Sequence, residues 1–380
     1  MSKPSLIAAA GGILAAAALV GSSGAAASDA TVRGAHTSAT SSAFVASLHS
    51  IKTIGSTVPP SGDANPYGLV VVPANAGSLK AGNYLVSNFN SKSNNQGTGT
   101  TIVQMTPSGK LSVFATINAK ALPGPCPGGV GLTTALTILP GGYVVVGSLP
   151  TTNGQSATAQ FGCLIVLDSS GHAVETIAGK NIQGPWDMTS VTQGSTATLF
   201  VSNVLTGGPK AGLKTVNNST VLRIRLSVAA GHAPTVQSQQ VVANGIPWRD
   251  DKAALAIGPT GVALAANGTL YVADTLESRI IAVPNAMTRS TPLLDKGITV
   301  SSGGHLNQPL GLILATNGDI LTTNAGDGNI VETTPSGHQI ATVAGDAKAG
   351  AGSLFGLAIA PGGKTLVYVD DAANTLRLLH

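Results

Sequence analysis

Apolar and polar residues alternate in short runs along most of the chain, and turn-forming residues bound each run. The stretch "NGTLYVADTLESRIIAVP", residues 267–284, holds two apolar runs, 269–273 and 279–283, joined by a polar turn that begins at Asp274. Runs of about five apolar and β-branched residues between turn signals predict β-strands. The preceding Asn267 and Gly268 favour a hairpin, because both accept positive φ angles.

The same pattern recurs at six places. Three copies are close: "GPTGVALAANGTLYVAD" from Gly258, "QPLGLILATNGDILTTN" from Gln308 and "LFGLAIAPGGKTLVYVDD" from Leu354. Three looser copies begin at positions 65, 129 and 184, so the copies lie roughly 45 to 75 residues apart. Self-similarity at such a period is typical of repeat architectures.

Each copy predicts a first strand, a tight turn, a second strand ending in Ser, Asn or Asp, a loop and further strands. Four strands per repeat is the pattern of a β-propeller blade. The last copy lacks a fourth strand, whereas "SIKTIGSTVP", residues 50–59, is strand-like and has no copy of its own. We therefore predict an all-β, six-bladed β-propeller in which this N-terminal strand closes the last blade and removes exposed edges.

Composition agrees with this fold and excludes several function classes. The 48 Gly and 21 Pro residues disfavour long helices, and 43% hydrophobic residues suffice for a core. Net charge is only +4 and Lys and Arg are scattered, so nucleic-acid binding is not expected. The histidines share no metal spacing, and the chain has no P-loop, no dinucleotide-binding fingerprint and no haem-attachment motif.

The N-terminus has the pattern of an export signal. Lys3 precedes an apolar stretch over 6–20, and Ala25–Ala27 offer a cleavage site before Ser28. We predict a signal peptide over 1–27, a flexible mature N-terminus over 28–49 and the propeller over 50–380; a membrane anchor is the alternative for the apolar stretch. No later segment is long enough to span a bilayer. The mature protein is expected to be periplasmic or secreted and monomeric.

Two cysteines, Cys126 and Cys163, are present. An even number in an exported protein predicts a disulfide, and two free buried thiols are the alternative.

The fourth copy resembles an NHL repeat. The resemblance rests on "GVAL" at 261–264, "NGTLYVAD" at 267–274 and "RI" at 279–280; it is good over 258–380 and weak over 65–250. It implies a six-bladed propeller that usually serves as a binding platform. Related propellers include the gluconolactonase-like hydrolases, the paraoxonases and the strictosidine-synthase-like proteins.

Polar residues at the ends of the second strands form one candidate site. Aligning the copies places one in each blade: Asn88, Ser148, Asn203, Asp274, Asn324 and Asp371. Asp and Asn at a strand end often bond to the backbone of the following turn. Alternatively, they form a ring of oxygen ligands, which would suit calcium as the cofactor.

Aromatic residues near the starts of the first strands form a second candidate site. Tyr67, Trp186 and Phe355 lie there, with Asp187 the one acidic residue, and Trp248 lies in the linker before the fourth copy. Aromatic walls with a few polar groups are typical of small-molecule pockets, so we predict a ligand site at Tyr67, Trp186, Asp187 and Phe355. The alternative is that the aromatic residues plug the channel or pack between blades.

The loops between second and third strands are long in the first three copies, over 89–100, 149–162 and 204–219. Loops on a rigid scaffold often carry function. The leading prediction is therefore non-catalytic recognition of a small molecule, glycan or protein on this face, without a cofactor. The alternative is a calcium-dependent lactonase, hydrolase or lyase of the gluconolactonase-like class, using Asp187 with Asn88, Asn203 or Asp274. The lactonase-like relatives place Glu, Asn and Asp at the first-strand starts. Here only Asp187 is acidic there, Asn65 and Gln308 are the amides, and no Glu leads the first blade. A structural or envelope-associated role is a third reading.

Overall fold

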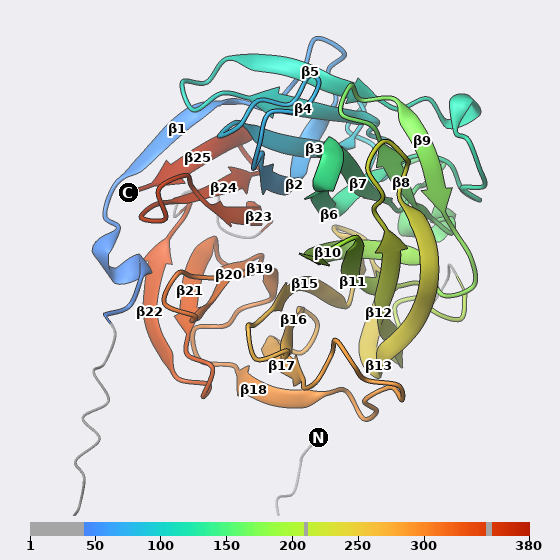
Figure 1. Ribbon diagram of the computed structural model, residues 1–380. Coiled ribbons are helices and arrows are strands. Elements are labelled where there is room, and N and C mark those ends of the chain that lie inside the picture. Colours follow the sequence, from blue (N-terminus) through green and yellow to red (C-terminus); the bar gives the residue numbers. More distant parts are fainter. Residues whose placement is uncertain (1–41, 209–211, 347–351) are drawn as a thin grey trace, which may run out of the picture. The chain divides into compact units, whose positions relative to one another are not determined.

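The computed structural model describes residues 42–208, 212–346 and 352–380, in which six β-sheets surround a central channel (Figure 1). The predicted six-bladed β-propeller is confirmed. The predicted signal peptide lies outside the described residues. Among those residues, no helix is long and apolar enough to cross a membrane. We name the blades A to F in chain order of their first strands.

Blades A to C come from the first half of the chain. Blade A contains β2 (Ala64–Val71), β3 (Tyr84–Asn90), β4 (Thr101–Met105) and β5 (Leu111–Thr116). Blade B contains β6 (Leu132–Leu139), β7 (Tyr143–Ser148), β8 (Cys163–Leu167) and β9 (Ala173–Ile177). Blade C has five strands: β10 (Gly184–Gln193), β11 (Thr196–Val204), β12 (Val216–Ser227), β13 (Thr235–Asp251) and β14 (Leu255–Ile257).

Blades D to F complete the ring. Blade D contains β15 (Pro259–Leu264), β16 (Leu270–Asp274), β17 (Arg279–Val283) and β18 (Ile298–Ser302). Blade E contains β19 (Pro309–Leu314), β20 (Ile320–Asn324), β21 (Asn329–Thr333) and β22 (Gln339–Ala344). Blade F contains β23 (Leu354–Ile359), β24 (Leu366–Asp370), β25 (Thr375–Leu379) and, as its outer strand, β1 (Ile51–Ser56).

The predicted closure by the N-terminal strand is confirmed. β1 pairs antiparallel with β25, with Ile51 opposite Leu379 and Ser56 opposite Thr375. The adjoining residues 42–49 belong to the segment expected to be flexible, yet Val45 is fully buried. The Glu332 carboxylate on β21 accepts hydrogen bonds from the backbone N–H groups of Phe44 and Val45, both at 2.8 Å. Blade E therefore anchors the chain just before the closing strand.

Apolar side chains fill the spaces between neighbouring blades. The middle strands are almost wholly buried, whereas outer strands such as β22 alternate between half-buried and exposed residues. The first strands line the channel and contact one another around the ring, in the order β2, β6, β10, β15, β19, β23 and back to β2. Their starts and ends consequently face the two openings of the channel.

Hydroxyl groups connect alternate blades to their neighbours. Ser87, Ser202 and Thr323 on the second strands of blades A, C and E accept hydrogen bonds from the first strand of their own blade, at Gly68, Asp187 and Gly311. Each also donates to a backbone carbonyl of the next blade, at Thr133, Thr260 and Phe355. The matching positions in blades B, D and F are Gly147, Ala273 and Val369, which have no hydroxyl.

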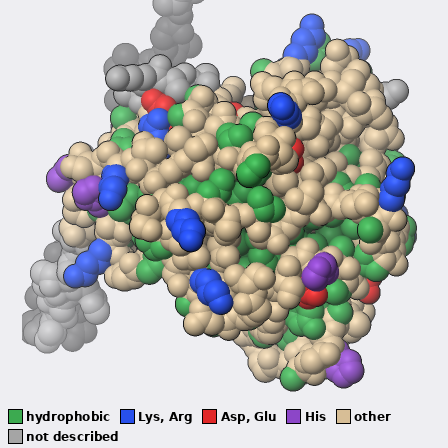
Figure 2. Space-filling model, turned by 90° about the horizontal axis from the view of Figure 1, so that it is seen from above, with side chains coloured by type: hydrophobic (Ala, Val, Ile, Leu, Met, Phe, Trp, Pro, Cys, Tyr) green, Lys and Arg blue, Asp and Glu red, His purple; other side chains and the backbone are tan. Residues whose placement is uncertain are grey.

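The predicted disulfide is confirmed between Cys126 and Cys163, whose Cα atoms are 5.2 Å apart. It joins the segment before β6 to the start of β8 and so fixes the end of the long loop of blade B. A disulfide is typical of a protein from an oxidising compartment. On the face in Figure 2, Lys and Arg side chains stand apart from one another, without a continuous basic patch.

Candidate functional site

A cavity of about 510 Å³ lies at the end of the channel where the first strands begin. We call it the mouth cavity. Blades A, E and F and the β13–β14 hairpin of blade C supply its lining. Its principal residues are Asn65, Tyr67, Asn90, Gln308, Phe355 and Asp371. Loop residues Asn94 and Gln96 also line it, which confirms that the long loop of blade A projects from the face where the first strands begin.

An aromatic cluster forms the floor of the mouth cavity and closes the channel. The Tyr67 ring stacks on Phe355, with ring centroids 3.9 Å apart, and on Phe89, at 4.4 Å. Trp186 meets Tyr67 and Phe89 edge-on, at 5.8 and 6.2 Å. Tyr67 and Phe355 line the cavity, whereas Trp186 lies behind them and is 1% exposed. We call these four residues the aromatic plug.

Trp248, expected in a linker, lies on β13 of blade C and is almost fully buried. Its Nε1 donates a hydrogen bond of 2.6 Å to Asn218 Oδ1. It therefore contributes to blade packing and does not line the mouth cavity.

The polar wall of the mouth cavity joins blades A and F. In the amide orientation that satisfies its neighbours, Asn65 donates to both carboxylate oxygens of Asp371, with a distance of 2.7 Å to Oδ2. The Asn65 carbonyl oxygen then accepts from Asn90 Nδ2 at 3.2 Å. Burial, with a smaller contribution from Asp370, raises the pKa of Asp371 to about 7. This carboxyl can therefore gain or lose a proton near neutral pH.

Two amide residues of the mouth cavity have a backbone conformation that is uncommon without glycine. Asn65 has φ 65° and Gln308 has φ 54°, and each directly precedes a proline of a first strand, Pro66 of β2 or Pro309 of β19. Side chains other than glycine rarely adopt positive φ, and such strain is concentrated at functional sites. Asn65 and Gln308 therefore have a less favourable backbone conformation than glycine would have at the same positions.

The rim of the mouth cavity carries an ion pair and a contact between loops. Arg249 Nη2 lies 3.3 Å from Asp251 Oδ2, at the end of β13. Gln96 of the blade A loop donates a 2.6 Å hydrogen bond to the carbonyl oxygen of Ala253. The long loop of blade A therefore reaches across the opening to blade C.

The residues predicted as a calcium ring bond to their own blades. All of them except Asp371 lie on second strands, one strand outward from the channel. The amides of Asn88, Asn203 and Asn324 donate to carbonyl oxygens of the loops that precede their blades, at Thr57, Asn181 and His305. Ser148 Oγ donates to Gly129 O, and Asp274 pairs with Arg279. Among the described residues, no hydrogen bond or ion pair joins them to one another around the axis, so their metal-binding role stays a prediction.

Asp371 does not occupy the position that the sequence alignment gave it. Leu354 pairs with Asp370, just as Pro309 pairs with Asn324, so Asp370 is the equivalent residue. Asp370 binds Arg377 at 2.7 Å. The sequence has two consecutive aspartates, Asp370 and Asp371, so the alignment could not tell which one ends the second strand. Asp371 follows the strand end by one residue and lines the mouth cavity.

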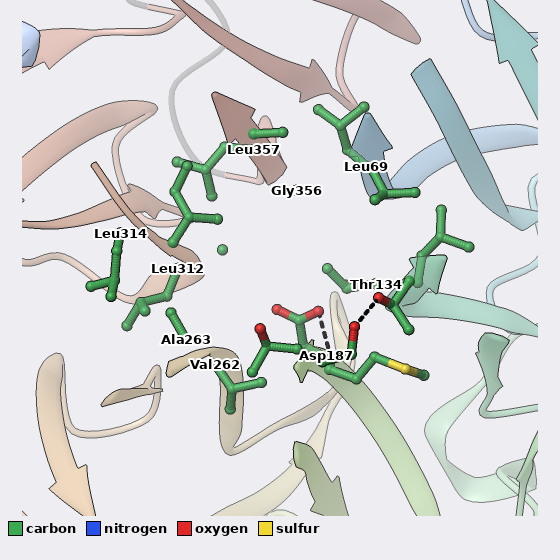
Figure 3. A pocket seen from close by; sticks show the side chains of 18 of the residues that line it. Leu69, Thr134, Asp187, Val262, Ala263, Leu312, Leu314, Gly356 and Leu357 are labelled. Carbon is green, nitrogen blue, oxygen red and sulfur yellow. Dashed lines mark hydrogen bonds between the residues drawn. The ribbon is translucent and has the colours of Figure 1, made fainter. Parts of the chain in front are cut away.

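Asp187 is separated from the other residues predicted to bind a ligand. Whereas Trp186 belongs to the aromatic plug, Asp187 faces a cavity of about 420 Å³ in the remaining part of the channel (Figure 3). We call this the lower cavity; its lining includes Leu69, Leu136, Met188, Val262, Leu312 and Leu357. No hydrogen bond or ion pair between described residues joins Asp187 to Asn88, Asn203 or Asp274.

The mouth cavity is a poor match for calcium, the metal considered from the sequence. Calcium takes six to eight oxygen ligands, commonly several carboxylates. Here Asp371 is the one carboxylate beside the Asn65 and Asn90 amides, and Asp251 is paired with Arg249. Within the described residues, no group of three or more His, Cys, Asp or Glu side chains could hold a metal ion.

Solved structures of several six-bladed propellers are similar to this chain. A gluconolactonase from Xanthomonas campestris has a TM-score of 0.55 and 14% identity, over 89% of this chain and 90% of that chain. The calcium-binding protein regucalcin from Agrobacterium tumefaciens has a TM-score of 0.52 and 14% identity, over 86% and 93%. A luciferin-regenerating enzyme has a TM-score of 0.52 and 12% identity, over 87% and 95%.

At these identities the likeness shows the fold alone, since propellers host many unrelated functions. No family model and no curated protein matches the sequence. The resemblance to NHL repeats therefore stays a prediction, whereas the distant similarity to gluconolactonase-like propellers is shown.

Proposed function

We propose that the protein is an exported recognition protein whose mouth cavity binds a small polar molecule rich in hydroxyl groups, such as a sugar or a sugar acid. The convergence of Asn65, Asn90, Gln308 and Asp371 above the aromatic floor is the observation that supports this proposal. A volume of about 510 Å³ is in the usual range for small-molecule sites.

The chemistry of the wall suits hydroxyl groups. Each amide offers both N–H donors and a carbonyl acceptor, and a carboxyl group near its pKa can donate or accept. A hydroxyl group likewise donates and accepts, so the two partners can satisfy each other. The apolar floor formed by Tyr67 and Phe355 would contact the C–H face of such a ligand.

Binding can be tested by calorimetry with a panel of monosaccharides, aldonic acids and their lactones. The informative variants are Asn65→Gly and Gln308→Gly, because glycine keeps the positive φ and removes only the amide. We expect each to weaken binding about tenfold. The matched control is Asn285→Gly, since Asn285 is exposed, has φ 55° and follows β17 away from the cavity.

Equal binding by Asn65→Gly, Gln308→Gly and wild type would contradict the proposed site. If no member of the panel binds, the ligand class is wrong.

A second candidate function, hydrolysis of a bound ester or lactone, is favoured by one observation. Asp371 has a pKa of about 7 in a cavity, and a general base works best when its pKa is close to the working pH. The rate of glucono-1,5-lactone hydrolysis by the protein should then increase with pH around pH 7, and Asp371→Asn should lose this increase. A wild-type rate equal to the rate without protein would exclude this candidate and leave binding alone.

A further inference from the structure

The lower cavity is separate from the mouth cavity, because the aromatic plug lies between them. The separation falls within one or two residues on each strand: Tyr67, Leu310 and Phe355 line the mouth cavity, whereas Leu69, Gly311 and Gly356 line the lower one. All six first strands contribute to the lower cavity. Its volume of about 420 Å³ is enough for a small organic molecule.

The lower cavity is open at the end away from the plug. Residues next to the plug, such as Val262, Leu312 and Leu357, are buried, whereas Val71, Leu314 and other residues at the strand ends are half-buried. A ligand could therefore enter without passing the mouth.

Asp187 occupies a position at which four other blades have glycine. Strand pairing aligns it with Gly68, Gly261, Gly311 and Gly356. Each of these residues directly precedes the residue that pairs two positions before the polar end of the second strand, such as Met188 opposite Val201. A Cβ atom on Gly261, Gly311 or Gly356 would lie within 2.5 Å of the next blade's backbone. The junction of blades C and D, in contrast, accommodates a complete aspartate side chain.

The Asp187 carboxyl group points into the lower cavity, whose lining combines aliphatic side chains with the hydroxyl-bearing Thr134, Thr137, Thr189 and Ser190 (Figure 3). One oxygen accepts a 2.8 Å hydrogen bond from the Met188 N–H, and the Val262 N–H also donates to the carboxyl. No other residue lining the cavity has a titratable side chain, and within the described part of the chain no ion pair involves Asp187. Burial raises the pKa of Asp187 well above its usual value.

We propose that the lower cavity is a second ligand site, for a small apolar amine whose ammonium group pairs with the Asp187 carboxylate while its hydrocarbon body contacts the aliphatic walls. A buried carboxylate without a counter-ion is unfavourable, and a cationic ligand supplies the missing charge. The leucine, valine and methionine side chains of the wall gain apolar contact when a hydrocarbon replaces water.

The proposal can be tested by calorimetry on the whole protein with 1-adamantylamine, and with 1-adamantanol as a matched uncharged probe. We expect the amine to bind the wild-type protein at least tenfold more tightly than the alcohol. Asp187→Asn keeps the size and an acceptor for the Met188 N–H but cannot become an anion. It should lose this preference and bind the two probes with similar affinity.

Asp371→Asn removes the mouth carboxyl and should leave amine binding unchanged, which distinguishes the two cavities. Wild-type protein that binds neither probe, or binds the amine no better than the alcohol, would overturn the proposal even if Asp187→Asn does not fold. Loss of amine binding in Asp371→Asn with retention in Asp187→Asn would also overturn it. Asp187 would then serve only to bond the Met188 and Val262 backbone.

Discussion

Asp274 and Arg279 form a buried ion pair across the turn between β16 and β17. Arg279 Nε and Nη2 both lie 2.8 Å from Asp274 Oδ2, and the side chains are 9% and 0% exposed for Arg279 and Asp274. The other Asp274 oxygen accepts from the Glu277 N–H at 3.4 Å, so the carboxylate also holds the turn. Burial raises the pKa of Asp274 to about 6, although Arg279 opposes the shift.

Asp274→Asn should therefore destabilise the protein, because it leaves the buried Arg279 charge with Glu277 as its one acidic partner among the described residues. Removing one member of a buried pair commonly costs a few kcal/mol, and we expect about 3 kcal/mol. Urea denaturation should show a lower midpoint. The exposed Asp295→Asn is the control and should stay within about 0.5 kcal/mol of wild type. An unchanged midpoint for Asp274→Asn would mean that the pair adds nothing to stability.

Thr323→Val should weaken the junction of blades E and F. The substitution keeps the shape of the side chain but leaves the Gly311 N–H and the Phe355 carbonyl without this partner. Leaving these buried polar groups unsatisfied should lower the free energy of unfolding by about 1–3 kcal/mol. Thermal denaturation should detect the loss, whereas Thr291→Val, at an exposed position, should not change the midpoint. Equal stability of the two variants would show that the hydrogen bonds of the Thr323 hydroxyl group do not stabilise the protein.

The six blades could be predicted from sequence because their signals are local. Asn-Gly and Gly-Gly turns between short apolar runs determine each hairpin, and the repeat of these hairpins indicates the ring. The hydroxyl residues that connect neighbouring blades occur in the sequence as Ser87-Asn88, Ser202-Asn203 and Thr323-Asn324. The carbonyl that each hydroxyl binds, however, lies in another blade. No local pattern predicts a hydrogen bond between blades.

Stability should depend on pH through Asp371. Its pKa in the folded protein, about 7, is above its ordinary value of 3.8, so the folded state holds this proton more tightly than the unfolded state. The stability of wild type relative to Asp371→Asn should therefore be highest near pH 4, fall as pH rises to about 7 and then level off. Urea titrations of both proteins at several pH values test this. A difference that grows in favour of wild type with rising pH would contradict it.

Removing the disulfide should lower stability. The Cys126–Cys163 bond closes a loop with a sequence separation of 37, for which the chain-entropy relation gives about 4 kcal/mol. The double variant Cys126→Ala/Cys163→Ala should melt at a lower temperature than oxidised wild type. Reductant should destabilise wild type and leave the variant unchanged. A variant as stable as oxidised wild type would show that packing alone holds the blade B loop.

The candidate site was harder to predict than the fold, because its contacts join distant parts of the chain. Asn65 and Asp371 meet only because the ring places blade F beside blade A. The unusual position of Asp187 did have a signal: the motif reads "GPWD" where other copies read "GPTG", "QPLG" and "NPYG". What the sequence could not reveal is that Trp186 is part of the aromatic plug, whereas Asp187, the next residue in the chain, faces the lower cavity.

The strand that closes blade F also bears on how the molecule assembles. Ile51 pairs with Leu379, so the two partners are synthesised 328 residues apart (51 to 379). Blades A to E can each form from segments that are close in the sequence, whereas the ring cannot close until β25 is available to pair with β1. Contacts over such separations form slowly, because loop closure must precede them. Until then β1 is an unpaired strand that can join another molecule, and the anchoring of Phe44 and Val45 by Glu332 keeps it beside the gap that it must fill.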